Sequence, residues 1–118
     1  MADTTVHVTT LALNAATANP TGTAIVAANN HVITPTKPNS KVFIRLNNTF
    51  AGAKDFTILA GDNPPADAAG QGNLVVNILQ DATQLVVLEG ARFLQNNGNI
   101  HITVAASTTG FIEAIQLP

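Results

Sequence analysis

The sequence predicts an all-β chain that folds as a single domain, 1–118, a β-sandwich or barrel with a jelly-roll-like arrangement of eight or nine strands. Two observations support this prediction. The β-branched residues Thr, Val and Ile favour strands and are abundant, whereas Lys and Arg together number five and Met occurs once. Turn-forming Gly, Pro and Asn residues recur about every ten residues, as in sandwiches and barrels built from short strands.

The first expected strand covers residues 4–13 and changes phase along its length. Val6 and Val8 alternate with polar residues, and the apolar positions then shift to Leu11 and Leu13. A β-bulge would produce such a shift, because it inserts one residue into the alternation. Residues 23–28 and 31–34 are expected to form a second strand region that is broken at Asn29-Asn30. The other strands expected in the first half are residues 41–47 and 56–60.

Two strands have patterns that predict how they are buried. Residues 41–47 alternate clearly, with Val42, Ile44 and Leu46 on one face, which predicts one covered and one open face. Residues 74–79 are almost wholly apolar, which predicts a strand that is covered on both faces.

The last third of the chain predicts a tightly turned antiparallel meander. Asn97-Gly98 lies between two apolar runs, and this pair favours a type I′ hairpin turn because both central residues need positive φ. Successive strands in this region are therefore expected to pair with one another. The expected strands are residues 84–88, 91–95, 99–105 and 111–117.

One long loop, residues 61–72, is expected to contact a partner. Its Gly and Pro content leaves it without regular structure, and loops of this length in compact domains are often functional. The partner-contacting residues proposed here are Asp62, Asn63, Pro64 and Pro65. A plain surface loop is the alternative, in which Asp62 caps a turn.

The composition indicates a structural or binding protein rather than a nucleic-acid or membrane protein. Charged residues make up 10% of the chain, and the five Lys and Arg residues do not cluster, so the counterions of a nucleic acid would not be displaced. No apolar run approaches the ~20 residues that span a bilayer. A surface with few charges suits a protein packed in an assembly, because repulsion between copies is small. A monomer with a neutral surface is the alternative.

The sequence offers no group of residues typical of an enzyme, so no catalytic residue, cofactor or metal site is expected. His7, His31 and His101 are far apart and have no ligand at metal-binding spacing. The chain contains no Cys, which excludes thiolate ligands and disulfides. Its two serines, Ser40 and Ser107, fall in turn-forming segments without the surroundings of a nucleophile.

Arg92 has two possible roles. It follows Glu89 by three positions across Gly90, so the two side chains could form a salt bridge across a bend. Alternatively, its planar guanidinium group, with five donors, could reach carboxylate or carbonyl groups of a neighbouring subunit.

Two stretches of the second half, residues 60–74 and 88–102, together with the ending 109–118, resemble small structural proteins of tailed bacteriophages. The similarity is strongest to capsid decoration, or cement, proteins. It covers about half of the chain and includes no diagnostic motif, so no functional residue is transferred from the family.

The resemblance implies a virion protein that is made in the host cytoplasm and binds the outer surface of an icosahedral head. Its partners would be the major capsid protein and further copies of itself, as a dimer or trimer, because oligomers on a shell follow its symmetry axes. The N-terminal segment 1–10 is expected to be an arm that adds a strand to a neighbour's sheet, with Thr4, Thr5 and Val6 at the interface.

Two other functions remain open. The chain could be a tail, baseplate or fibre module of the same kind of particle. It could also be a soluble domain that binds a carbohydrate or another ligand, although sugar sites commonly use Trp or Tyr and the chain has neither. Its five Phe side chains are expected in the core: Phe43, Phe50, Phe56, Phe93 and Phe111.

Overall fold

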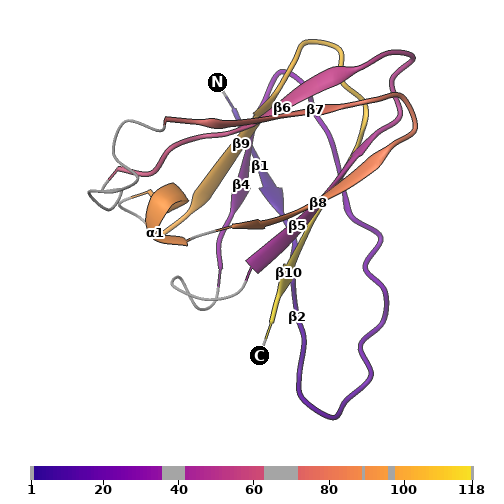
Figure 1. Cartoon of the computed structure of the whole chain (residues 1–118). Helices are drawn as coiled ribbons and strands as arrows, with labels where there is room; N and C mark the ends of the chain where they lie inside the picture. Colours follow the sequence, from indigo (N-terminus) through magenta and orange to yellow (C-terminus); the bar gives the residue numbers. More distant parts are fainter. Residues whose placement is uncertain (1, 36–41, 63–71, 89, 96–97, 118) are drawn as a thin grey trace.

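The computed structural model describes residues 2–35, 42–62, 72–88, 90–95 and 98–117. These residues form ten strands in two five-stranded sheets (Figure 1). Sheet A contains, in spatial order, β1 (Asp3–Val6), β4 (Asn30–Ile33), β9 (Ile100–Val104), β6 (Lys54–Ile58) and β7 (Leu74–Ile78). Sheet B contains β2 (Val8–Thr10), β10 (Gly110–Gln116), β5 (Val42–Asn48) and β8 (Thr83–Leu88), with β3 (Thr23–Ala24) also paired to β10.

The strand order is that of a jelly roll. The four strands β3-β10-β5-β8 form one layer and β4-β9-β6-β7 form the other, and from β3 onward only the β6–β7 connection stays within one sheet. Crossing between layers at nearly every connection produces the two nested Greek keys of this topology. The predicted jelly-roll-like sandwich is therefore confirmed, and the alternative of a barrel is not, because the two sheets do not close on each other.

The N-terminal segment hydrogen-bonds to both sheets instead of extending as an arm. β1 pairs with β4 in parallel, and β2 pairs with β10 in parallel. The break between β1 and β2 falls at His7, where the chain leaves one sheet and enters the other, which explains the phase shift in the sequence. Residues 3–10 thus differ from the expected free arm, since their backbone pairs within the chain and Val6 is 2% exposed in the core.

The expected C-terminal meander is wrong. Successive strands β8, β9 and β10 alternate between sheets B, A and B, and none of them pairs with the next. Part of the expected strand 91–95 is instead a helical turn, α1 (Gly90–Phe93), which links the two layers and places Phe93 in the core at 3% exposure. The physical reason is that a strand with one buried face has the same alternation whether its neighbour in sequence is in the same sheet or the opposite one.

The tight turn at Asn97-Gly98 has partial support, although Asn97 lies outside the described residues. Gly98 has a φ of 83°, and its N–H donates to the Gln95 carbonyl oxygen at 2.9 Å. The Gln95 N–H in turn donates to the carbonyl oxygen of Asn99 at 2.8 Å. The chain therefore reverses here as predicted, but it joins a helical turn to a strand rather than two paired strands.

The core lies between the sheets and is formed by alternate residues of each strand. Along β5 buried and half-buried residues alternate throughout, which confirms the predicted pattern of Val42, Ile44 and Leu46. The opposite layer contributes Phe56 and Ile58, both fully buried. The other residues of the core cluster are Val6, Ile33, Ile78, Leu88, Phe93, Ile100, Ile102, Ile112 and Ala114.

β7 departs from its prediction. Its apolar sequence predicted cover on both faces, yet Val75 is 56% exposed and the following Leu79 is 66% exposed. The cause is that Val75 faces outward from sheet A, where no further layer covers the sandwich within the described residues, and β7 is the last strand of its sheet.

Candidate interaction surface

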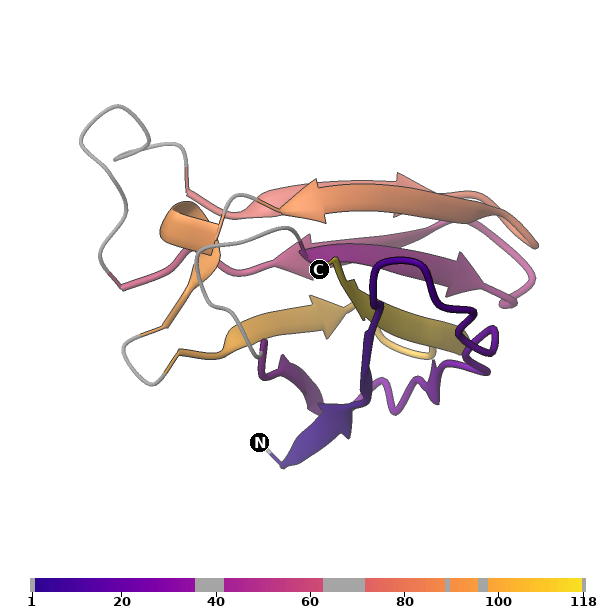
Figure 2. The ribbon, with the colours of Figure 1, turned by 90° about the horizontal axis from the view of Figure 1, so that it is seen from below.

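The exposed apolar side chains gather at one side of the sandwich. Seven large hydrophobic side chains are exposed among the described residues, and four of them, Val75, Leu79, Leu85 and Val87, lie on β7, β8 or the turn between them. Figure 2 shows β7 and β8 together at one side of the sandwich, with β1 at the opposite side. We call this region, residues 74–88, the β7–β8 side.

β7 and β8 are the terminal strands of their sheets. Among the described strands, β7 pairs only with β6 and β8 pairs only with β5. The N–H and C=O groups on the other edge of each strand therefore have no strand partner within this part of the chain. Such an edge is a template for pairing with another chain unless charges, prolines or bulges protect it.

The outer face of sheet B carries apolar side chains across three strands. The register places Val87, Phe43 and Ile115 side by side in one row. Phe111 lies on the same face and is 43% exposed, and Phe43 is half-buried there. The expectation that these two side chains belong to the core is therefore wrong. Ile115 is 5% exposed although it faces outward. The accessible large apolar side chains of this face are therefore Phe43, Leu85, Val87 and Phe111, and they lie among the polar residues Arg45, Asn47, Thr83 and Glu113.

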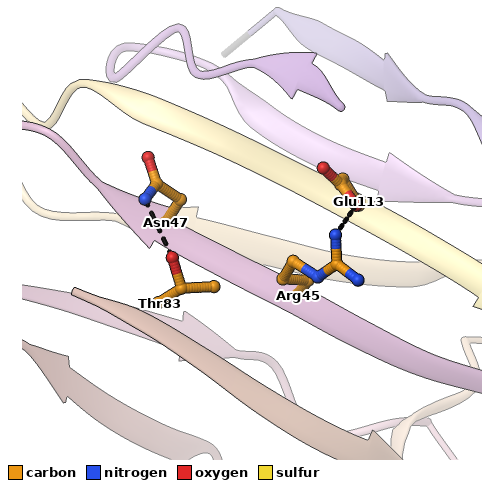
Figure 3. Close-up of polar contacts among 4 residues, drawn as sticks. All are labelled: Arg45, Asn47, Thr83 and Glu113. Atoms are coloured by element: carbon orange, nitrogen blue, oxygen red, sulfur yellow. Dashed lines mark hydrogen bonds and ion pairs between the residues drawn. The ribbon is translucent and has the colours of Figure 1, made fainter. Parts of the chain in front are cut away.

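One ion pair occupies the middle of this face. Arg45 Nη1 lies 2.9 Å from Glu113 Oε2, and the two side chains are 33% and 11% exposed. Figure 3 shows the guanidinium group directed from β5 toward Glu113 on β10, and therefore away from β8 on the other side of β5. The charge next to Leu85, which is the residue opposite Arg45 on β8, is thus paired and turned away from the sheet edge.

A neutral hydrogen bond links the same strands at the next position. Asn47 Nδ2 donates to Thr83 Oγ1 at 3.0 Å, and this contact joins β5 to the start of β8 (Figure 3). β8 itself carries no charged residue, since its six residues are Thr, Gln, Leu, Val, Val and Leu.

The outer face of sheet A is more polar. Thr57 lies between Thr103 and Val75 in one row, and Asp55 lies opposite Asn77 in another. Asn77 Nδ2 donates to Asp55 Oδ1 at 2.8 Å, so charged and amide groups border β7. The two outer faces of the sandwich therefore differ in polarity, and the outer face of sheet B carries more large apolar side chains.

The predicted N-terminal interface residues lie on β1, away from the β7–β8 side (Figure 2). Thr4 is half-buried and its Oγ1 accepts a hydrogen bond from Asn29 Nδ2 at 2.9 Å. Thr5 is exposed, and Val6 is a core residue. Only Thr5 of these three presents a free outer side chain.

The backbone segments that contain Asp62 and Arg92 lie side by side. The N–H of Gly61 donates to the Arg92 carbonyl oxygen at 2.7 Å, and the N–H of Asp62 donates to that of Leu94 at 3.3 Å. The Arg92 side chain stays within the chain, since its Nη2 donates to the carbonyl oxygen of Gly72 at 3.3 Å. Its guanidinium carbon also lies 4.8 Å from the centre of the Phe93 ring.

The other residues of the loop prediction, Asn63, Pro64 and Pro65, lie outside the described residues, and so does Glu89, the proposed salt-bridge partner of Arg92. The sequence reasoning missed the β8 edge. An uncharged strand such as Thr83–Leu88 occurs both at the centre and at the edge of sheets, so its composition alone did not reveal its position.

A pocket of about 400 Å³ lies over the outer face of sheet B, where Thr9 of β2 and Glu113 of β10 face the β2–β3 loop. Figure 1 shows the chain between β2 and β3 as a wide loop that extends beyond the sandwich, and residues 17–22 of this loop form one wall. His7, Thr9 and Glu113 form the other wall. The lining contains no aromatic side chain on which a sugar would stack.

Within the described residues, no three His, Asp or Glu side chains are grouped so that they could hold a metal ion. The same part of the chain has no helix with the length and apolar character needed to cross a membrane. Comparisons with protein-family models, curated proteins and solved structures gave no match to this chain.

Proposed function

We propose that this chain is a virion structural protein, a capsid decoration protein that binds the outer surface of an icosahedral phage head and stabilises contacts between major capsid subunits. The observation that carries the proposal is the group of apolar side chains on the outer face of sheet B, where Phe43, Leu85, Val87 and Phe111 lie around one ion pair, Arg45–Glu113. The resemblance of the second half to cement proteins points to the same role.

The surface chemistry supports binding to a shell by many weak contacts. Interface centres are depleted in charge and enriched in aromatic residues and Arg, which matches the row of Phe43 and Val87 beside Arg45. A shell presents many equivalent sites, so modest contacts at each copy give stable coverage when copies are linked. This role requires no catalytic group and no cofactor.

The structure changes which residues we assign to the shell contact. Val6 is in the core and β1 is paired, so deletion of the N-terminal segment would disturb the domain rather than remove only an interface. We assign the contact to the outer face of sheet B. Phe111 is the probe of choice, because it is partly exposed and lies on β10, two strands from the β8 edge.

The test is quantitative mass spectrometry of particles purified from the source, with copies of this chain counted against the main shell protein. Hundreds of copies in a simple ratio support the decoration role. A handful of copies would move the chain to the tail or baseplate, and its absence from particles would contradict both roles.

The surface assignment is tested with particles that lack the protein. The wild-type chain and Phe111→Lys are added back, and bound copies are counted. We expect the Lys variant to lose at least tenfold in occupancy, while Thr57→Lys on the outer face of sheet A binds like the wild type. Equal occupancy of all three proteins would contradict the assignment.

A further inference from the structure

We propose that two copies of this chain pair through β8, edge to edge and antiparallel, about a two-fold axis. The pairing would join the two B sheets into one continuous sheet. This inference goes beyond the capsid role, because it concerns the isolated chain and holds or fails whether or not the protein decorates a particle.

β8 is the least protected edge of the described sandwich. Natural edges are kept from pairing by shortness or by charged side chains. β2 and β3 are short, with three and two residues. β1 carries Asp3, and β7 is bordered by the exposed carboxylate of Asp55 on its neighbour β6, which accepts a hydrogen bond from Asn77 of β7.

β8 has none of these protections. It contains six residues without charge or proline, and Leu85 and Val87 are 63% and 77% exposed. Its free edge offers main-chain donors and acceptors, and another β-strand is the occupant that satisfies both kinds of group. The structure thus specifies a strand as the partner, and not merely an apolar surface.

A second copy is the partner that this edge fits. A two-fold axis places the same strand opposite itself, so the pair succeeds only if the strand tolerates its own side chains. Two β8 strands bring no like charges together. Leu85 and Val87 of each copy would lie beside those of the other on the same outer face, as apolar cross-strand pairs.

The ion pair within sheet B neutralises Arg45, the charged residue that lies opposite Leu85 of β8. Arg45 is the strong cation nearest to Leu85 in the register, and its guanidinium group binds Glu113 on the side of β5 opposite β8 (Figure 3). Two facing copies would therefore meet without an unpaired charge along Thr83–Leu88, and the nearest described acidic residue in sequence is Asp81, two positions before the strand. The joined sheets would also double the apolar outer face that we assign to the shell contact.

The interface is small, since it consists of one pair of six-residue strands and the side chains beside them. Interfaces below about 1,200 Å² are commonly weak or transient. We therefore expect a reversible dimer with a dissociation constant in the range of about 1–100 µM, which becomes stable only when many copies share one scaffold.

Cysteine scanning tests the pairing directly, because the chain contains no native Cys. Single substitutions at Thr83, Gln84, Leu85, Val86 and Val87 are oxidised in the full chain, and the disulfide-linked dimer is quantified. In an antiparallel two-fold pair only a residue at or beside the axis meets its own copy within the 4.4–6.8 Å that a disulfide allows between Cα atoms. We expect cross-linking to peak at one or two adjacent positions and to fall at least fivefold on either side.

Leu13→Cys is the matched control, since Leu13 has the same 77% exposure as Val87 but lies in the β2–β3 loop. Cross-linking that is equal at Leu13 and along β8, or absent along β8, would overturn the proposal.

Sedimentation velocity over a range of concentrations provides the second test. We expect Val87→Lys to raise the dimer dissociation constant at least tenfold and Leu13→Lys to leave it unchanged, with circular dichroism showing that both fold. A wild-type chain that stays monomeric up to about 0.5 mM, or a dimer that both variants leave intact, contradicts β8 pairing. Phe111→Lys separates the two proposals, because it should abolish particle binding and preserve the dimer.

Discussion

Asn47 and Asn48 are neighbours on β5, and their side-chain amides have opposite environments. Asn48 is fully buried, and its Nδ2 donates to the carbonyl oxygens of Ile78 and Gly52, each at 2.9 Å. Its Oδ1 accepts a hydrogen bond from the N–H of Phe50 at 2.9 Å. Asn47 points to the outer face and makes the single side-chain bond to Thr83. The Asn48 amide therefore ties the end of β5 to β7 and to the 50–52 turn.

Replacing Asn48 with Asp should destabilise the fold strongly. The carboxylate would face the carbonyl oxygens of Ile78 and Gly52 without a proton to donate, and it would be buried. We expect the free energy of unfolding to fall by about 3 kcal/mol, measured by urea denaturation with tryptophan-independent detection such as far-UV circular dichroism.

Asn47→Asp is the matched control, because the position is adjacent, the chemical change is identical and the side chain is on the outer face. It should cost less than about 1 kcal/mol. Similar losses for the two variants would show that the buried amide network is not what stabilises this end of β5.

Gly110 is expected to resist substitution for a backbone reason. Its φ is 139°, and a Cβ atom there would overlap the carbonyl oxygen of Asn47 on the paired strand. Gly110→Ala should therefore cost about 3 kcal/mol of unfolding free energy, from strained φ and from the displaced strand together. Gly98→Ala is the comparison, since its φ is 83° but a Cβ atom would meet nothing within 4 Å. It should cost only about 1 kcal/mol, and equal losses would contradict the role of strand contact.

How much of the fold the sequence predicted depends on which property is considered. The alternation of β5 revealed its buried face correctly, because burial acts on each strand separately. Strand partners were not predictable in the same way, since β9 and β10 have one buried face each whether they pair or lie in opposite layers. Strand number and turn spacing predicted a sandwich or barrel, and the order of strands that makes it a jelly roll is set by the crossing connections. The turn at Gly98 suggested pairing of successive strands, which these connections replace.

The candidate surface was less predictable than the fold. Val75 and Val87 belong to apolar runs that would suit a strand covered on both faces, yet they lie on outer faces of the two layers and on the terminal strands β7 and β8. The position of an edge is set by the whole topology, so no local pattern reveals it. Arg92 shows the same limitation, because its contacts to Gly72 and Phe93 arise where α1 meets a distant segment.

His31 should make stability depend on pH. Its side chain is fully buried on the core side of β4, and its Nε2 accepts a hydrogen bond from the Val26 N–H at 3.1 Å. Burial lowers the pKa of His31 below its ordinary value of 6.5, and a backbone hydrogen bond with Ile102 offsets part of this effect. Protonation would also place a second donor against the Val26 N–H.

The sign of the effect follows from proton uptake. Because the pKa of His31 is lower in the folded chain, the unfolded chain binds more protons below about pH 6.5, and the free energy of unfolding falls as the pH decreases from 7.5 to 5. Urea denaturation at both pH values should show this loss in the wild type and a smaller one in His31→Gln. His7→Gln, at an exposed position, should retain the wild-type dependence. An unchanged pH dependence in His31→Gln would exclude this histidine as the cause.

Val6 tests whether the N-terminal segment belongs to the domain. β1 and β2 pair with different sheets, and Val6 at the end of β1 is 2% exposed within the core cluster. Val6→Ala removes two buried methyl groups and should lower the free energy of unfolding by about 2 kcal/mol. Val26→Ala, at 45% exposure, makes the same chemical change at the surface and should cost less than about 1 kcal/mol. If Val6→Ala were as mild as Val26→Ala, β1 would contribute little to the fold, and the segment would again be available as an arm for a neighbouring chain.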